Sequence, residues 1–150
     1  MGPGAAVILV DSNILMRYTN SGDLCYPIVD AAIGTLSSRG RKLCIAPQIL
    51  YEFWAAATRP VSVNGLGFST AECVVAMGHI EHLFLLLPDQ PTLLAEWKAL
   101  VVNHQCQGKV SHDARLVAAM RTHGVTDILT FNVADFRRYP GITVIEPAAP

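Results

Sequence analysis

Four acidic side chains stand at or just after the expected carboxyl ends of strands. Asp11 ends an apolar run, Glu52 lies in a helix that follows a second run, and Asp113 stands in the first turn of a later helix. Asp135, preceded by Asn132, follows the apolar segment "DILTF". Clustered carboxylates repel one another unless a cation offsets their charge, and oxygen ligands without His or Cys suit Mg²⁺ or Mn²⁺. The pattern therefore indicates metal-assisted hydrolysis, with a site that can clamp a phosphodiester.

Each acid taken singly also has a structural interpretation as a helix cap, a turn residue or a surface charge. In "VSHDARLVAAMRTHG", Ser111 could cap a helix and Gly124 could end it,. Asp113 would then stabilise the helix N-terminus by about 0.3–1 kcal/mol. What favours a cluster is the coincidence that three or four acids fall where parallel strands would present them at one edge.

Strands that alternate with helices would position these acids. Apolar runs predict strands in "AAVILVDSN", "KLCIAP", "LFLLLPD", "TDILTFN" and "ITVIEP",. Helical spacing of apolar residues predicts helices over residues 26–39, 47–58, 71–84, 90–105 and 110–124, with a loop at "VNGLGFS",. This alternation predicts an α/β fold with a mostly parallel sheet, in which ligand sites lie beyond the carboxyl ends of the strands.

Composition narrows the class of protein. We expect residues 1–150 to form a single domain,. Hydrophobic residues make up 51% of the chain and charged residues only 15%, against about 25% charged in a typical domain, so we expect a protein partner or self-association. The net charge of -1 excludes a global basic field, and nucleic-acid binding would need a local patch,.

The cysteines and the apolar runs indicate where in the cell the protein is expected. Four widely spaced cysteines fit neither a zinc nor a disulfide framework,. No apolar run approaches the roughly 18 residues of a membrane span. The N-terminal run has no basic segment before it and is interpreted as a first strand rather than a signal peptide. We therefore expect a cytoplasmic protein with no membrane association.

Histidines offer weaker alternatives. His79 and His82 are spaced to share one helix face and could bind a transition metal, but no third ligand is evident and a solvated face is the simpler interpretation,. The spacing of His104, Cys106 and His112 fits no zinc pattern. His112 could contact phosphate beside the acids, although an exposed histidine at a helix start is the plainer expectation.

Four motifs carry a resemblance to a known family. In this order, "VDSNIL", "APQILYEF", "HDARLVAAM" and "TFNVADF" resemble the PIN-domain ribonucleases, in particular the VapC-type toxins of bacterial toxin–antitoxin pairs. The segment "ATRPVSVNGLG" resembles one bacterial branch of these proteins. The resemblance implies a three-layer α/β/α sandwich, a metal-dependent endoribonuclease acting on RNA, a cognate antitoxin as partner and a homodimer.

The resemblance also implies roles for the acids. Asp11, Glu52 and Asp113 would hold Mg²⁺ or Mn²⁺ and orient the water that attacks an RNA phosphate. Asn132 stands where some relatives carry an aspartate, and Asp135 is the nearby acid that could supply the charge.

Hydroxyl, amide and guanidinium groups complete the expected site. Ser12 replaces a threonine that is common in the first motif, which keeps the hydroxyl, while Asn13 and Thr130 would orient carboxylates or phosphate,. Arginines near the motifs are candidate contacts to RNA phosphates, despite the net charge. They are Arg17, Arg59, Arg115, Arg137 and Arg138.

Rival functions remain open. A non-catalytic PIN-like domain that binds RNA or protein is favoured by Asn132, which replaces an acid. A haloacid-dehalogenase-type phosphatase would need an aspartate two residues after Asp11, where Asn13 stands. A receiver domain would need an acidic pair before the end of the first strand and a late lysine, and neither is convincing.

Overall fold

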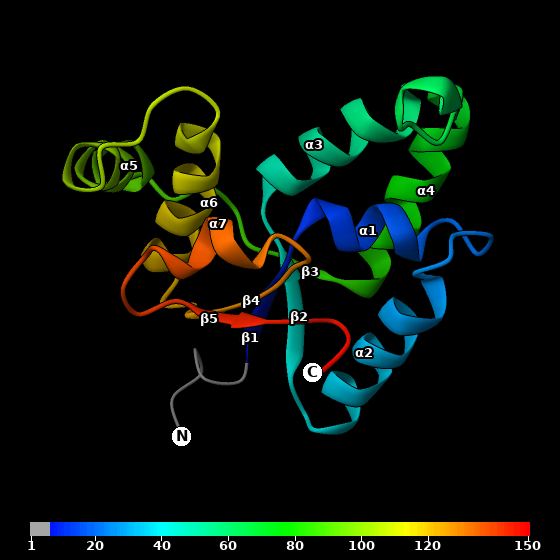
Figure 1. Cartoon of the computed structure of the whole chain (residues 1–150), viewed down its shortest axis with the longest axis horizontal. Coiled ribbons are helices and arrows are strands. Elements are labelled where there is room, and N and C mark those ends of the chain that lie inside the picture. Colours follow the sequence, from blue (N-terminus) through cyan, green and yellow to red (C-terminus); the bar gives the residue numbers. More distant parts are fainter. Residues whose placement is uncertain (1–6) are drawn as a thin grey trace.

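A parallel sheet forms the centre of the molecule (Figure 1). The structure is a computed structural model and describes residues 7–150; the predicted strand residues Ala5 and Ala6 lie outside the described part. Within it, five strands pair in the order β3-β2-β1-β4-β5, and every pairing is parallel. The strands are β1 (Val7–Val10), β2 (Lys42–Ile45), β3 (Leu85–Leu86), β4 (Asp127–Leu129) and β5 (Thr143–Ile145).

Helices connect the strands and cover the sheet. The α-helices are α1 (Ser12–Tyr18), α2 (Tyr26–Ser38), α3 (Pro47–Thr58), α4 (Thr70–Leu83), α5 (Leu93–Asn103), α6 (Val110–Thr122) and α7 (Val133–Arg137). A short 3-10 helix, η2, spans Val61–Val63. The predicted three-layer α/β/α fold is confirmed. None of the helices among residues 7–150 combines the length and the apolar character needed to span a bilayer.

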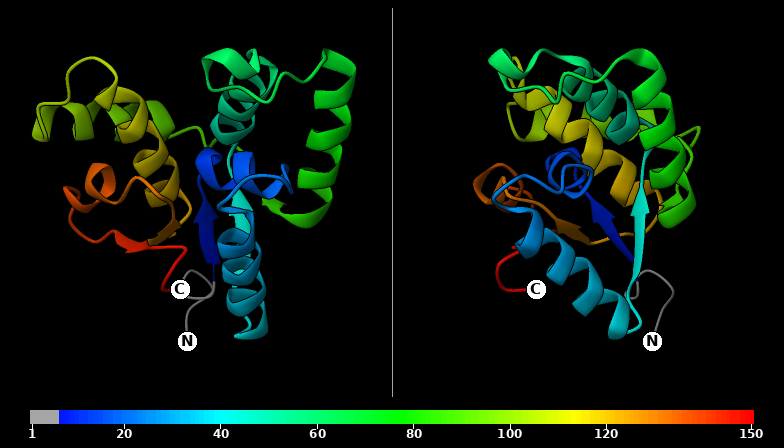
Figure 2. Two further views of the ribbon diagram at one scale, coloured as in Figure 1. Left: turned by 45° about the vertical axis from the view of Figure 1, so that its right-hand side comes forward. Right: turned by 90° about the vertical axis from the view of Figure 1, so that its right-hand side faces the viewer.

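Strand β1 occupies the middle of the sheet, between β2 and β4. Ile8, Leu9 and Val10 are at most 1% exposed, as expected for a parallel strand that is covered on both faces. Because the apolar run ends at Val10, the next residue leaves the sheet at its carboxyl edge. Figure 2 shows the α3–α4 pair and the α5–α6 pair on opposite sides of this edge, where α1 begins.

Two α-helices were not predicted, and one N-terminal helix cap was predicted wrongly. Helices α1 and α7 have 7 and 5 residues, which is too short for apolar periodicity to mark them. Ser111 does not cap α6, because that helix already begins at Val110, and the Ser111 hydroxyl donates to the Gly108 carbonyl instead. Gly124 follows the end of α6 with a φ of 67°, as a C-terminal glycine does,.

Candidate active site

Asp11 lies where β1 ends and α1 begins, and it is the N-cap of that helix. Its side chain is only 4% exposed. Oδ1 accepts the Ser12 N–H at 2.7 Å, and Oδ2 accepts the Thr130 hydroxyl at 2.7 Å. Burial raises the pKa of Asp11 to about 6, although the hydrogen bonds from Thr130 and Ser12 oppose the rise. This carboxylate is therefore held rigidly in a poorly solvated place, where a cation would favour its charged form.

Thr130 and Asn13 tie the end of β4 to the start of α1. Thr130 is fully buried, and its hydroxyl also accepts the Asn13 Nδ2 donor at 3.1 Å and the Asn132 N–H at 3.0 Å. The Asn13 Oδ1 accepts the Phe131 N–H at 3.3 Å. These contacts fix Asp11 relative to the neighbouring strand. The expected roles of Thr130 and Asn13 in a metal site stay a prediction.

Glu52 reaches the same place from α3. Its Oε1 accepts the Ser12 hydroxyl at 3.2 Å, and its Oε2 accepts the Gln48 amide at 3.1 Å. Gln48 is 7% exposed and was missed in the sequence, although residues four apart share one helix face. The same Gln48 amide donates to the His112 carbonyl at 2.9 Å in α6, and its Oε1 accepts from Arg115 at 2.9 Å. Gln48 thus connects the Glu52 carboxylate to the helix that carries Asp113.

Asp113 and Asp135 form a more open side of the site. Asp113 is half-buried in the first turn of α6, and Asp135 is exposed in the first turn of α7. Burial raises the pKa of Asp113 to about 6, and Asp135 adds the next largest increase. Asp11 and Glu52 raise the pKa of Asp113 further by charge repulsion, so Asp113 feels the charges of the other three predicted acids.

The four carboxylates fit a cation, but they do not yet form a closed ligand set. Among residues 7–150, no three His, Cys, Asp or Glu side chains lie close enough together to ligate one ion. Asp11 and Glu52 accept hydrogen bonds from protein donors instead. The donor chemistry is nevertheless that of Mg²⁺ or Mn²⁺, because every acid offers only oxygen.

Comparisons with solved structures identify the fold. A chain of the VapBC2 complex from Rickettsia felis, bound to a promoter DNA fragment, matches with a TM-score of 0.70 and 11% identity over 93% of this chain and 98% of that chain. VapC20 of Mycobacterium tuberculosis, a toxin that cleaves the sarcin–ricin loop, matches with a TM-score of 0.65 and 17% identity over 87% and 94%. A chain of VapBC-1 from nontypeable Haemophilus influenzae matches with a TM-score of 0.69 and 12% identity over 94% of this chain and 98% of that chain.

The chain has the PIN-domain fold of the VapC toxins. No protein-family model and no curated protein matches the sequence. At these identities the PIN fold is shared while most side chains differ, so the site has to be judged on its own residues. The four predicted acids of this PIN fold come from the end of β1 and from α3, α6 and α7.

The predicted arginines have different surroundings on this PIN fold. Arg17 in α1 pairs with Asp23 at 3.7 Å, and its guanidinium lies 5.6 Å from the centre of the Phe131 ring. Arg115 bonds to Gln48 and to Asp89. Arg115 is therefore linked to Glu52 through Gln48.

Among residues 7–150, the other three predicted arginines form no ion pair with the four acids. Arg138 donates to the His104 carbonyl at 2.7 Å and packs over the Tyr139 ring. Arg59 and Arg137 have exposed side chains. Their contact with RNA stays a prediction.

Proposed function

We propose that this protein is a metal-dependent endoribonuclease and the toxin of a toxin–antitoxin pair. The observation that supports it most is the convergence of Asp11, Glu52, Asp113 and Asp135 on one edge of the sheet, where three of them raise the pKa of the fourth. The PIN fold adds that VapC20, which shares it, is a toxin that cleaves RNA of the sarcin–ricin loop.

Asp11, Glu52, Asp113 and Asp135 would hold Mg²⁺ or Mn²⁺. A bound cation of this kind neutralises carboxylates, polarises a phosphodiester and lowers the pKa of water. The protein's own groups prepare for this. Thr130, Asn13 and Ser12 keep the Asp11 carboxylate oriented, and the buried environment strengthens every charge interaction there,.

Cleavage of an RNA pool tests the function. A mixture of tRNA and rRNA fragments is incubated with the protein in Mg²⁺, Mn²⁺ or EDTA. We expect cleavage only with metal, and its loss in Asp11→Asn. Asp30→Asn is the matched control, because Asp30 is an exposed acid on α2. Cleavage in EDTA, or equal cleavage by Asp11→Asn, would contradict the proposal.

The alternative is a non-catalytic PIN-like domain that binds RNA or protein. Asn132, which stands in place of an acid, favours it, and so does the lack of a closed three-ligand set among residues 7–150. Calorimetric titration with Mn²⁺ separates the two functions. Heat of binding that disappears in Asp113→Asn supports the nuclease, whereas no binding to the wild-type protein supports the alternative.

An antitoxin and a second copy of the chain are the proposed protein partners. Large apolar side chains on α4 and β3 are 40–61% exposed. They are Val74, Val75, Leu83, Leu85 and Leu86. Exposed apolar area of this kind is typical of a surface that receives an amphipathic segment. Light scattering of the purified chain, alone and co-expressed with a candidate antitoxin, measures both associations. A monomer in both conditions would contradict them.

A further inference from the structure

A polar pocket lies beside the candidate active site, between the end of α1 and the loop that contains η2. Its volume is about 380 Å³, near the lower end of the roughly 300–1,000 Å³ range of small-ligand pockets. Polar groups from Arg17, Asn20, Asp23 and Asn64 line it, with apolar surface from residues such as Leu66. Such a pocket suits one planar, polar group rather than a long apolar ligand.

Arg17 joins this pocket to the site. Arg17 follows Asn13 by four residues and so shares its face of α1, about 6 Å further along the helix. Asn13 accepts the Phe131 N–H, and the Arg17 guanidinium lies over the Phe131 ring. The Arg17 guanidinium therefore lies about one helical turn from Asn13, the residue that contacts Asp11. A phosphate next to the one at the acids would come within its reach.

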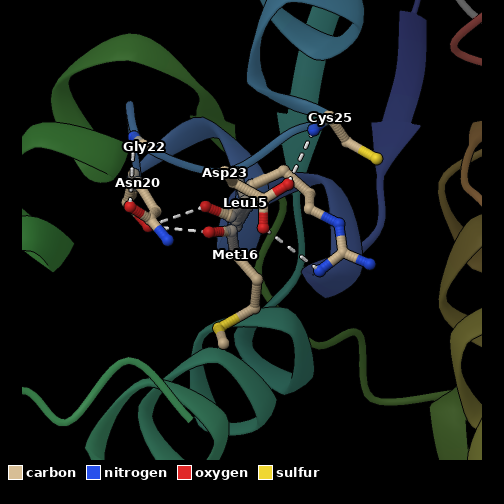
Figure 3. Close-up of polar contacts among 8 residues, drawn as sticks. Leu15, Met16, Asn20, Gly22, Asp23 and Cys25 are labelled. Carbon is tan, nitrogen blue, oxygen red and sulfur yellow. Dashed lines mark hydrogen bonds and ion pairs between the residues drawn. The ribbon is translucent and has the colours of Figure 1, made fainter. Parts of the chain in front are cut away.

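The guanidinium is held in place from the other side by Asp23. One oxygen of Asp23 accepts the Cys25 N–H at 2.8 Å, and the other pairs with Arg17 (Figure 3). Asn20 accepts the Gly22 N–H at 3.3 Å through its Oδ1. The Nδ2 donor of Asn20 and the second lone pair of its Oδ1 are the groups that it can offer a ligand.

The opposite wall is a rigid loop. The Gly65 N–H donates to the Pro60 carbonyl at 3.0 Å, and the Gly67 N–H donates to the Arg59 carbonyl at 2.8 Å. A Cβ on Gly65 would lie only 1.9 Å from the Arg59 carbonyl oxygen, so no other residue fits there. Asn64 has a φ of 64°, which Asn tolerates better than most residues,. The loop therefore fixes the backbone of Asn64, whose side chain lines the pocket.

We propose that this pocket binds one nucleotide of single-stranded RNA next to the bond that is cut. Arg17 contacts its phosphate, and the Asn20 and Asn64 amides read the edge of its base. Amide side chains can donate and accept together, which is how proteins distinguish base edges. The inference rests on the proposed ribonuclease function and adds to it the residues that determine cleavage sequence.

Binding in EDTA tests the pocket without any cleavage. Fluorescence anisotropy measures the affinity of labelled single-stranded RNA hexamers, one for each base. We expect the wild-type protein to bind the hexamer of one base most tightly. Asn64→Gly should lower the affinity for that hexamer about tenfold and the affinity for the other three little. Glycine suits the positive φ, so this variant removes only the side chain. Arg17→Gln should lower the affinity for all four hexamers. It should also reduce the slope of log affinity against log salt concentration by about one.

Asn103→Ala is the matched control, because Asn103 is an exposed asparagine at the end of α5. If Asn64→Gly binds all four hexamers as this control does, or if the wild-type protein binds none, the pocket assignment is overturned. Sequencing of cleavage products separates the two proposals. Cleavage with an unchanged sequence preference in Asn64→Gly rejects the pocket and keeps the ribonuclease. Altered binding without cleavage in any metal rejects the ribonuclease and keeps the pocket.

Discussion

The two sides of the candidate site differ in how firmly the protein holds their acids. Asp11 is 4% exposed and accepts hydrogen bonds from Ser12 and Thr130. Asp113 and Asp135 are more exposed, and no residue among 7–150 donates a hydrogen bond to either carboxylate. The pKa values of Asp11 and Asp113 are nevertheless both raised to about 6. One side is thus held by protein donors, whereas the other is not.

Removing a donor on the Asp11 side should have the largest effect. Thr130→Val keeps the shape of the side chain. It removes the hydroxyl that donates to the buried Asp11 carboxylate and accepts the Asn132 N–H. We expect the free energy of unfolding to fall by about 1–3 kcal/mol and cleavage to fall with it. Urea unfolding measures the loss, with the exposed Thr126→Val as the control. An unchanged unfolding midpoint would mean that Asp11 is not held in advance.

Changing Gln48, which links the two sides, should have the next largest effect. Gln48→Met removes both donor bonds, to Glu52 and to the His112 carbonyl, at similar volume. Gln48→Glu removes the same donors but keeps the acceptor for Arg115. We expect either variant to need about 10–100-fold more Mg²⁺ for half-maximal cleavage, while the exposed Gln107→Met behaves as wild type. An unchanged metal requirement would show that Gln48 only packs the helices together.

A change on the open side should act in the opposite direction on stability. Asp113→Asn relieves repulsion from Asp135, Asp11 and Glu52. At pH 7 without metal, we expect the free energy of unfolding to rise by about 1 kcal/mol, after discounting for solvent screening of a half-buried group. Chemical denaturation in EDTA measures it. A loss of stability would place Asp113 among the structurally held acids, with Asp11.

The last prediction concerns the dependence of stability on pH. Because the pKa values of Asp11 and Asp113 are raised in the folded protein, that state binds more protons than the unfolded chain between about pH 4 and pH 6,. Metal-free protein should therefore gain stability as pH falls from 7 toward 5. The gain should shrink in Asp113→Asn, since only Asp11 still contributes. Thermal melts in EDTA across this range would show a flat profile if the acids were not desolvated.

The order of strands and helices could be predicted from the chain alone. Apolar runs and helical spacing are local patterns, so the five longer helices were found within about three residues of their observed bounds, and each strand lies within the longer segment that predicted it. Helices α1 and α7 were missed, because 7 and 5 residues are too few to show a period. The strand order, with β1 between β2 and β4, depends on contacts between distant segments, which no local pattern records.

The same division holds for the site. The sequence determined that Asp11 ends a buried strand and that Glu52 and Asp113 lie on helices, because burial and periodicity are written residue by residue. Only the tertiary structure decided that Gln48 joins Glu52 to α6 and that Arg17 lies over Phe131. These contacts arise when helices pack on the sheet, and packing brings together residues up to 119 positions apart, as Asp11 and Thr130 show.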